Sequence, residues 1–275
     1  MNEEGVNLQT EFSDRVQLNT DIVAALEATL SSKYRSAPDD FPRVESEGAA
    51  PRLETIGRTR SAKCLHPRYL PTDASPDPKR HSYANVDVSM LTWDLKPHEQ
   101  SSDWMVDAIL AMFVSSGVVR KFELELDALT HFILTVRHNY DDQPFHNFTH
   151  AFSVTHASWM MVQAEDVGCC LTDVDKLSIL VAAVCHDLGH PGVNNDFLAK
   201  TDDILARTYA PPILENHHWA LAKTILEAPN VGGRMLAALS DSVRQDLFTF
   251  VHEAIMATVR AIGPIATSSC RPHSG

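Results

Sequence analysis

The sequence predicts an all-α fold, an irregular multi-helix bundle, on three observations. After residue 85, apolar residues recur at spacings of three and four positions, which places them on one face of a helix. No segment alternates apolar and polar residues with the period of two that a half-buried strand requires. Several of the expected helices are apolar on more than one face, so they should pack around a shared interior.

The helices are expected in the following order along the chain. The first lies in residues 101–117, where Ser102 or Asp103 is a candidate N-cap. The next has apolar positions repeating over residues 129–136, and the last has them over residues 243–255. Between these, the helical pattern covers residues 150–163, 173–187 and 213–226. Residues 1–85 are instead expected to be a linker or disordered region. From residue 31 onward this segment is rich in Pro, Ser, Arg and Asp.

Composition excludes several classes of protein. At 275 residues and 44% hydrophobic content, the chain can form one large domain or two small ones, with an ample core. A formal net charge of −13 argues against binding to nucleic acid or to an anionic membrane surface. The longest apolar run, residues 177–185, is far shorter than the roughly 20 residues of a membrane span. The chain starts without a secretory signal, and its five cysteines form no CxxC pair, so we expect a cytoplasmic protein with reduced thiols.

The histidines are strongly clustered. Seven of the 14 lie between positions 146 and 218, accompanied by Asp187 and Glu215. His186 and His190 are one helical turn apart, as are the pair at 146 and 150, so each pair can face the same way. If the segments converge, a divalent metal would offset the cost of burying these groups and would suit mixed nitrogen and oxygen ligands.

The adjacent pair His186-Asp187 places a further constraint on such a site. Neighbouring side chains on a helix point about 100° apart, so both can face one ion only where the helix ends or is distorted. Gly189, Pro191 and Gly192 follow directly and can supply that distortion. The apolar run LSILVAAVC is therefore expected to end at a metal site.

Three motifs carry a resemblance to a known family. FHNFTHA (residues 145–151), HDLGHPGVNNDFLAKTDD (186–203) and LENHHWALAKTIL (214–226) resemble the signature segments of class I 3′,5′-cyclic-nucleotide phosphodiesterases, within the HD-domain metal hydrolases. The resemblance runs from about residue 93 to 258. It implies the all-α fold of that family and a two-metal hydrolysis of cAMP or cGMP to the 5′-monophosphate in cyclic-nucleotide signalling.

The resemblance also implies roles for individual residues. His150, His186 and Asp187 would bind the tighter metal, Zn²⁺, and Asp187 would bridge to a second metal, Mg²⁺ or Mn²⁺. The waters of this second metal would be held by His190, Glu215 and Thr258.

His146 would be the general acid that protonates the O3′ leaving group, and Glu215 would orient it. Asn147 and Asn216 would hydrogen-bond the ligands from outside. One of His217 and His218 is expected only to pack or hydrogen-bond, and His217 is kept among the outer candidates.

The motif match ends at Thr258. There IMAT is followed by VRAIGPIATSSCRPHSG, a tail over residues 259–275 with no family pattern. A fourth metal-ligating Asp and a purine-binding Gln, which the family carries further on, have no counterpart here. We therefore expect residues 86–258 to be a partial catalytic domain with its C-terminal part missing, of doubtful activity alone. The alternatives are a catalytically dead metal-binding fragment or pseudoenzyme, and another HD-type phosphohydrolase. The sequence gives no indication of oligomeric state.

Overall fold

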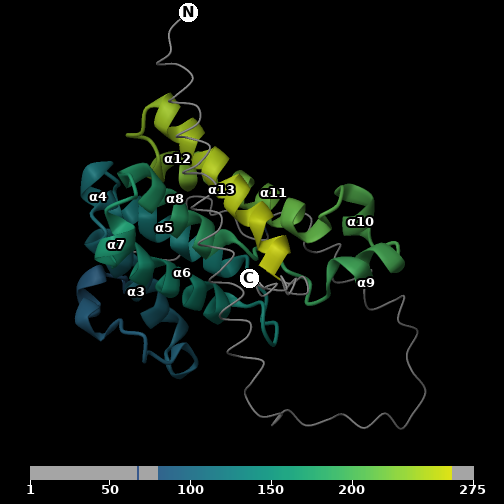
Figure 1. The fold of residues 1–275 in the computed structure, drawn as a ribbon, viewed down its shortest axis with the longest axis horizontal. Helices are drawn as coiled ribbons and strands as arrows, with labels where there is room; N and C mark the ends of the chain where they lie inside the picture. Colours follow the sequence, from purple (N-terminus) through teal and green to yellow (C-terminus); the bar gives the residue numbers. More distant parts are fainter. Residues whose placement is uncertain (1–66, 68–79, 262–275) are drawn as a thin grey trace, which may run out of the picture.

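The computed structural model describes Pro67 and residues 80–261, and this part of the chain is helical without a strand. The predicted all-α class is therefore confirmed. Figure 1 shows the helices packed into one body, with α9 and α10 at the end opposite α4 and α7. No helix within the described ranges is long and apolar enough to cross a membrane.

Three short 3-10 turns, η2 (Tyr83–Asn85), η3 (Val88–Met90) and η4 (Pro97–Glu99), precede the α-helices. The long helices are α3 (Ser102–Ser115), α5 (Leu126–His138), α6 (Phe148–Gln163), α8 (Asp173–Cys185), α11 (Ile213–Glu227) and α13 (Asp241–Ala261). The short helices between them are α4 (Val118–Lys121), α7 (Glu165–Gly168), α9 (Asn195–Lys200), α10 (Ile204–Thr208) and α12 (Gly232–Met235).

Local sequence explains where several helices begin. The hydroxyl of Ser101 accepts the backbone N–H of Trp104, so α3 is capped by Ser101 and not by the expected Ser102 or Asp103. Thr172 and Asp175 form a reciprocal capping box at the start of α8, in which each side chain accepts the other's backbone N–H. These caps satisfy backbone donors that have no partner inside the helix.

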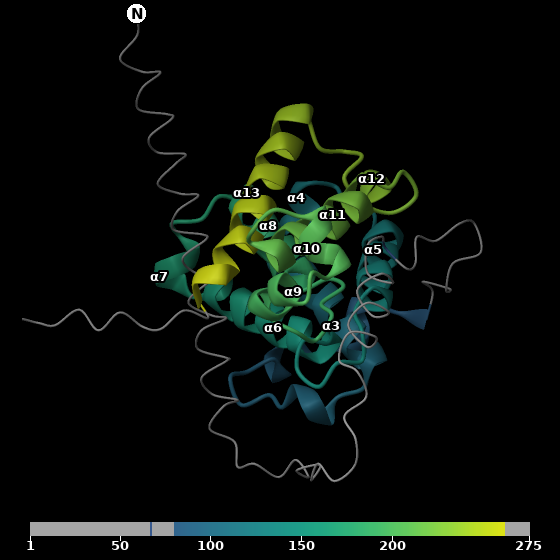
Figure 2. The same ribbon diagram turned by 90° about the vertical axis from the view of Figure 1, so that its right-hand side faces the viewer.

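Helix α8 is the central element of the bundle. Every residue from Leu177 to Cys185 is buried, because α8 packs against α6 and α13 and also contacts α5 and α11. Figure 2 shows α13 and α5 on opposite sides of the molecule with α8 between them. The main apolar core is built from these helices together with α3. A helix buried from Leu177 to its last residue is held firmly in place, and so is the polar segment that follows it.

The start of the described bundle lies against α3. Asp107 is buried on α3, and its carboxylate accepts hydrogen bonds from His81 Nδ1 (2.9 Å), the Ser82 backbone N–H (3.0 Å) and Asn85 Nδ2 (2.8 Å). Residues 81–85, which the sequence placed in the linker, are thus tied to the bundle. The remainder of the expected linker, apart from Pro67 and Arg80, lies outside the described residues.

The far end of the described chain is the C-terminal turn of α13. This helix continues to Ala261, three residues beyond the expected boundary at Thr258. The rest of the expected tail, residues 262–275, lies outside the described residues.

Candidate metal centre

The turn that follows α8 directs two adjacent side chains to the same place. The helix ends at Cys185, His186 is its C-cap, and Gly189 adopts a left-handed conformation with φ 68°. The N–H of Leu188 bonds to the carbonyl of Cys185, and that of His190 bonds to the carbonyl of Asp187. These tight turns replace the regular helical geometry, so His186 and Asp187 no longer diverge as helical neighbours would.

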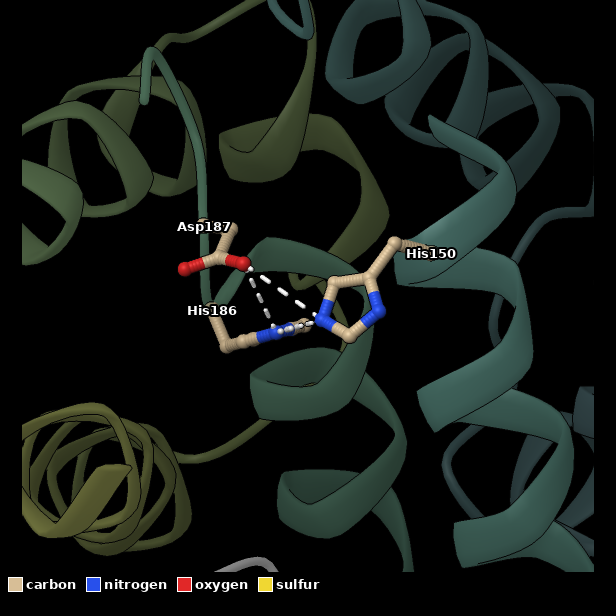
Figure 3. Close-up of side chains that lie close together, drawn as sticks. All are labelled: His150, His186 and Asp187. Carbon is tan, nitrogen blue, oxygen red and sulfur yellow. Dashed lines mark hydrogen bonds and ion pairs between the residues drawn. The ribbon is translucent and has the colours of Figure 1, made fainter. Parts of the chain in front are cut away.

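His150 on α6 meets this turn from the opposite side. Figure 3 shows the rings of His150 and His186 and the carboxylate of Asp187 converging between the two helices. His186 Nε2 lies 3.3 Å from His150 Nε2, and Asp187 Oδ2 lies 3.2 Å from His186 Nε2 and 3.5 Å from His150 Nε2. All three residues are buried. Three ligand-type atoms therefore form a nearly equilateral triangle inside the protein.

This triangle fits a divalent metal. A tetrahedral ion with bonds of about 2.0–2.1 Å to nitrogen and oxygen holds its ligands about 3.3 Å apart. The three measured separations, 3.2, 3.3 and 3.5 Å, agree with that value. Asp187 Oδ2 is buried and makes no hydrogen bond of good geometry, which is the condition of a ligand atom facing an ion. The donor set can accordingly bind a divalent cation.

Hydrogen bonding on the far side of the His186 ring supports the same arrangement. His186 Nδ1 lies 2.8 Å from the carbonyl of Ala183, and only a protonated nitrogen can donate to that oxygen. In the neutral ring, Nε2 then carries the lone pair and points into the triangle.

The charge of Asp187 is set by competing effects. Burial alone would raise the pKa of Asp187, but the imidazoles of His186, His190 and His218 hold it well below its usual value. The carboxylate is therefore ionised at neutral pH.

A second group of potential ligands shares Asp187. It consists of Asp187, His190 and His218, all buried, with His218 Nε2 lying 3.6 Å from Asp187 Oδ1. The Nδ1 of His218 bonds to the carbonyl of Leu188 at 2.7 Å, which leaves Nε2 directed at the carboxylate. His190 differs, because its Nδ1 accepts the N–H of Gly192 at 3.0 Å. The neutral His190 ring must then carry its proton on Nε2, which can donate to a water.

His146 stands beside this second group. Its half-buried ring is stacked on that of His190, with centroids 3.7 Å apart and planes 13° from parallel. It is set edge-on to His150, with centroids 5.9 Å apart. The structure thus brings His146, His150 and His190 together from two segments of the chain.

Glu215 lies in the first turn of α11. Its buried carboxylate accepts a hydrogen bond from Asn195 Nδ2 at 3.0 Å, while Asn195 Oδ1 accepts the backbone N–H of Leu214 at 2.8 Å. Burial raises the pKa of Glu215, and the Asn195 hydrogen bond opposes this increase. Asn195 thereby links the start of α9 to the start of α11.

The two asparagines expected outside the ligands hold backbone. Asn147 caps α6, with Oδ1 accepting the N–H of His150 at 3.1 Å and Nδ2 donating to Gln143. Asn216 donates to the carbonyls of Ala210 and Pro212 in the loop before α11. Each asparagine therefore fixes the element that carries a candidate functional side chain.

Thr258 and His217 make contacts outside the His150–His186–Asp187 triangle. Thr258 is buried near the end of α13, and its hydroxyl donates to Ile255 within the same helix. The buried ring of His217 packs near Tyr209, with centroids 5.4 Å apart, and a Cβ at Gly189 would lie 2.9 Å from its Nε2. The imidazole of the α11 pair that faces Asp187 belongs to His218.

Tyr140 and Asn195 were not among the predicted site residues, and of His217 and His218 only the former was kept as a candidate. Tyr140 and His218 both contact Asp187, and Asn195 bonds to Glu215. For His218 a signal was available, since residues three apart share a helix face and Glu215 is three positions earlier. For Tyr140 the sequence holds no such signal, because the contact spans 47 positions.

Comparison with known proteins shows what this part of the chain is similar to. Residues 145–261 match the model of a family described as 3′5′-cyclic nucleotide phosphodiesterase. A dual 3′,5′-cyclic-AMP and -GMP phosphodiesterase 11A of Takifugu rubripes is 38% identical over 157 residues. A cGMP-specific 3′,5′-cyclic phosphodiesterase of Drosophila melanogaster is 34% identical over 151 residues.

These alignments cover 57% and 55% of this chain but only 17% and 13% of the two relatives. A solved structure, the phosphodiesterase domain of the RhoPDE fusion protein from the choanoflagellate Salpingoeca rosetta, superposes with a TM-score of 0.58 at 28% identity. That match covers 66% of this chain and 55% of the other. The predicted resemblance to this family is confirmed by these matches, and the chain spans less than a fifth of the length of these curated relatives.

Proposed function

We propose that this chain, whose residues 145–261 match the model of the 3′5′-cyclic nucleotide phosphodiesterase family, supplies the metal site of a hydrolase acting on cAMP or cGMP. The observation that carries the proposal is the buried triangle of His150, His186 and Asp187, whose separations of 3.2–3.5 Å suit a tetrahedral cation. The proposed reaction adds water to phosphorus, breaks the bond to O3′ and gives the 5′-monophosphate.

The metals of this proposal are Zn²⁺ at the triangle and Mg²⁺ or Mn²⁺ on the opposite side of Asp187. Such cations, when bound, supply positive charge for the phosphoryl oxygens and lower the pKa of a bound water. Within the chain, His186 Nε2 is left as an acceptor by the bond from Nδ1 to Ala183. His190 presents an N–H, since its other ring nitrogen accepts from Gly192, and this N–H would hold water.

His146 is the proposed general acid. It is half-buried and stacked on His190, so its ring is restrained without being sealed from a substrate. It would donate a proton to O3′ as the P–O3′ bond breaks, and an imidazole titrates near neutral pH, which suits this task. Glu215, held by Asn195, is the proposed residue that orients His146.

The test is hydrolysis of cAMP and cGMP by the purified chain with Mg²⁺ or Mn²⁺, compared with His146→Ala, Asp187→Ala and the control His138→Ala. His138 is exposed on α5, outside the cluster. We expect the first two variants to lose about 10²-fold or more of the wild-type rate and the control to keep it. Turnover that survives Asp187→Ala would refute the proposal.

Two other outcomes would favour the alternatives. Metal binding that depends on Asp187 but brings no turnover would indicate a non-catalytic metal-binding chain. Hydrolysis of other phosphate esters without hydrolysis of cyclic nucleotides would indicate a different HD-type phosphohydrolase. A cytoplasmic location is part of the proposal, and five cysteines that form no CxxC pair support it.

A further inference from the structure

Tyr140 reaches the metal centre from a part of the chain that no motif covers. It follows the C-cap of α5, and its side chain is buried. The hydroxyl donates to the carbonyl of Val184 at 3.0 Å and accepts the backbone N–H of Asp187 at 3.2 Å. One oxygen therefore joins the last turn of α8 to the residue that both ligand groups share.

The neighbouring residue adds a third bond to the same turn. The carbonyl of Asn139 accepts the N–H of Gly189 at 3.1 Å. The carbonyls at the end of a helix and the N–H groups of the following turn lack intrahelical partners, and leaving them unpaired when buried is costly. Residues 139 and 140 satisfy three such groups between Val184 and Gly189. The turn is thus fixed from α5, a helix that supplies none of the candidate ligands.

We infer that Tyr140 is a positioning residue for the metal centre, its hydroxyl holding the backbone of Asp187 so that the carboxylate faces His150 and His186. This inference rests on the proposed metal site. Its physical basis is that Asp187 stands at the first irregular residues after α8, where the regular helical bonds no longer determine the direction of the side chain. The Tyr140 hydroxyl supplies the missing restraint.

The inference is tested by Co²⁺ titration of the full 275-residue chain, with the visible absorption spectrum of the bound ion as a probe of ligand geometry. Tyr140→Phe removes only the hydroxyl. We expect it to weaken Co²⁺ binding on the order of tenfold and to alter the spectrum, as loss of groups that orient metal ligands does. Binding and spectrum equal to those of the wild type would overturn the inference.

A matched control separates positioning from general destabilisation. Thr135→Val also removes a buried hydroxyl, which lies on α5 and donates to the carbonyl of His131 within the helix. We expect Thr135→Val to bind Co²⁺ with wild-type affinity and spectrum. Equal weakening in Thr135→Val and Tyr140→Phe would refute a specific role for Tyr140.

Asp187→Ala distinguishes failure of the inference from failure of the proposed function. If this variant binds Co²⁺ as the wild type does, the ion does not bind at the proposed site, and both the proposed function and the inference are refuted. A readout on the unmodified chain covers the case in which Tyr140→Phe does not fold. Co²⁺ should slow deuterium exchange of the Asp187 and Gly189 amides, and unchanged exchange would contradict the coupling.

Discussion

Replacing Gly189 by alanine should destabilise the protein through two separate effects. The backbone at Gly189 has φ 68°, a left-handed conformation that costs a residue with a Cβ roughly 1–2 kcal/mol. A Cβ there would also lie 2.5 Å from Leu221 Cδ1 and 2.9 Å from His217 Nε2. Forcing an extra carbon into such a packed place costs about 1–3 kcal/mol. The free energy of unfolding should therefore fall by roughly 2–5 kcal/mol.

Gly117→Ala provides the control that isolates the steric effect. Gly117 has a similar φ of 82°, but an added Cβ would meet nothing within 4 Å. We expect this variant to show the backbone cost alone, about 1–2 kcal/mol. Urea denaturation of both variants, monitored by circular dichroism, measures the difference. If Gly189→Ala proved no less stable than Gly117→Ala, the close packing of the turn against α11 would be refuted.

Three further predictions concern ions, protons and the start of the bundle. Zn²⁺ at 100 times its dissociation constant should stabilise the chain by about 2.7 kcal/mol in thermal melts, and an equal gain in Asp187→Ala would contradict the site. With a chelator present, urea midpoints should fall as the pH drops from 6.5 toward about 3, because burial lowers the pKa to about 3 for His190, His217 and His218. In this pH window the unfolded chain binds more protons than the folded chain, so the free energy of unfolding falls by up to about 1.4 kcal/mol per group and pH unit. Urea midpoints that do not change with pH would refute this prediction. Asp107→Ala should lower the free energy of unfolding by on the order of 2 kcal/mol and should speed proteolysis near residues 80–90. Asp103→Ala removes an exposed ion pair on the same helix and should lower the free energy of unfolding by under about 1 kcal/mol.

The helices were accessible to sequence reasoning because their signal is local. The run LSILVAAVC lies wholly within α8, and the expected helix over residues 213–226 corresponds to α11 (Ile213–Glu227). Helical periodicity reports which residues are buried without naming their partners. The need for a distortion after His186 could also be argued locally, from the geometry of adjacent side chains and the glycines that follow.

Contacts between distant segments could not be predicted in this way. Two examples are the hydrogen bond of Tyr140 to Asp187 and those of Asp107 to residues 81–85. These bonds depend on how the helices pack, and the local sequence around a polar residue does not show which distant residue it will contact. The choice between His217 and His218 could be predicted only in part. Helical phase relative to Glu215 favours His218, but only the packed structure shows that this face meets Asp187.

The electrostatics of the cluster explain why a buried apolar helix ends in these groups. Burial alone would raise the pKa of Asp187, but the imidazoles of His186, His190 and His218 hold it well below its usual value, so the carboxylate stays ionised inside the protein. Burying a charge is unfavourable unless the charge is paired. The proposed divalent cation between Asp187, His150 and His186 would supply positive charge beside this carboxylate, and the burial of α8 from Leu177 to Cys185 would keep the ligands in place.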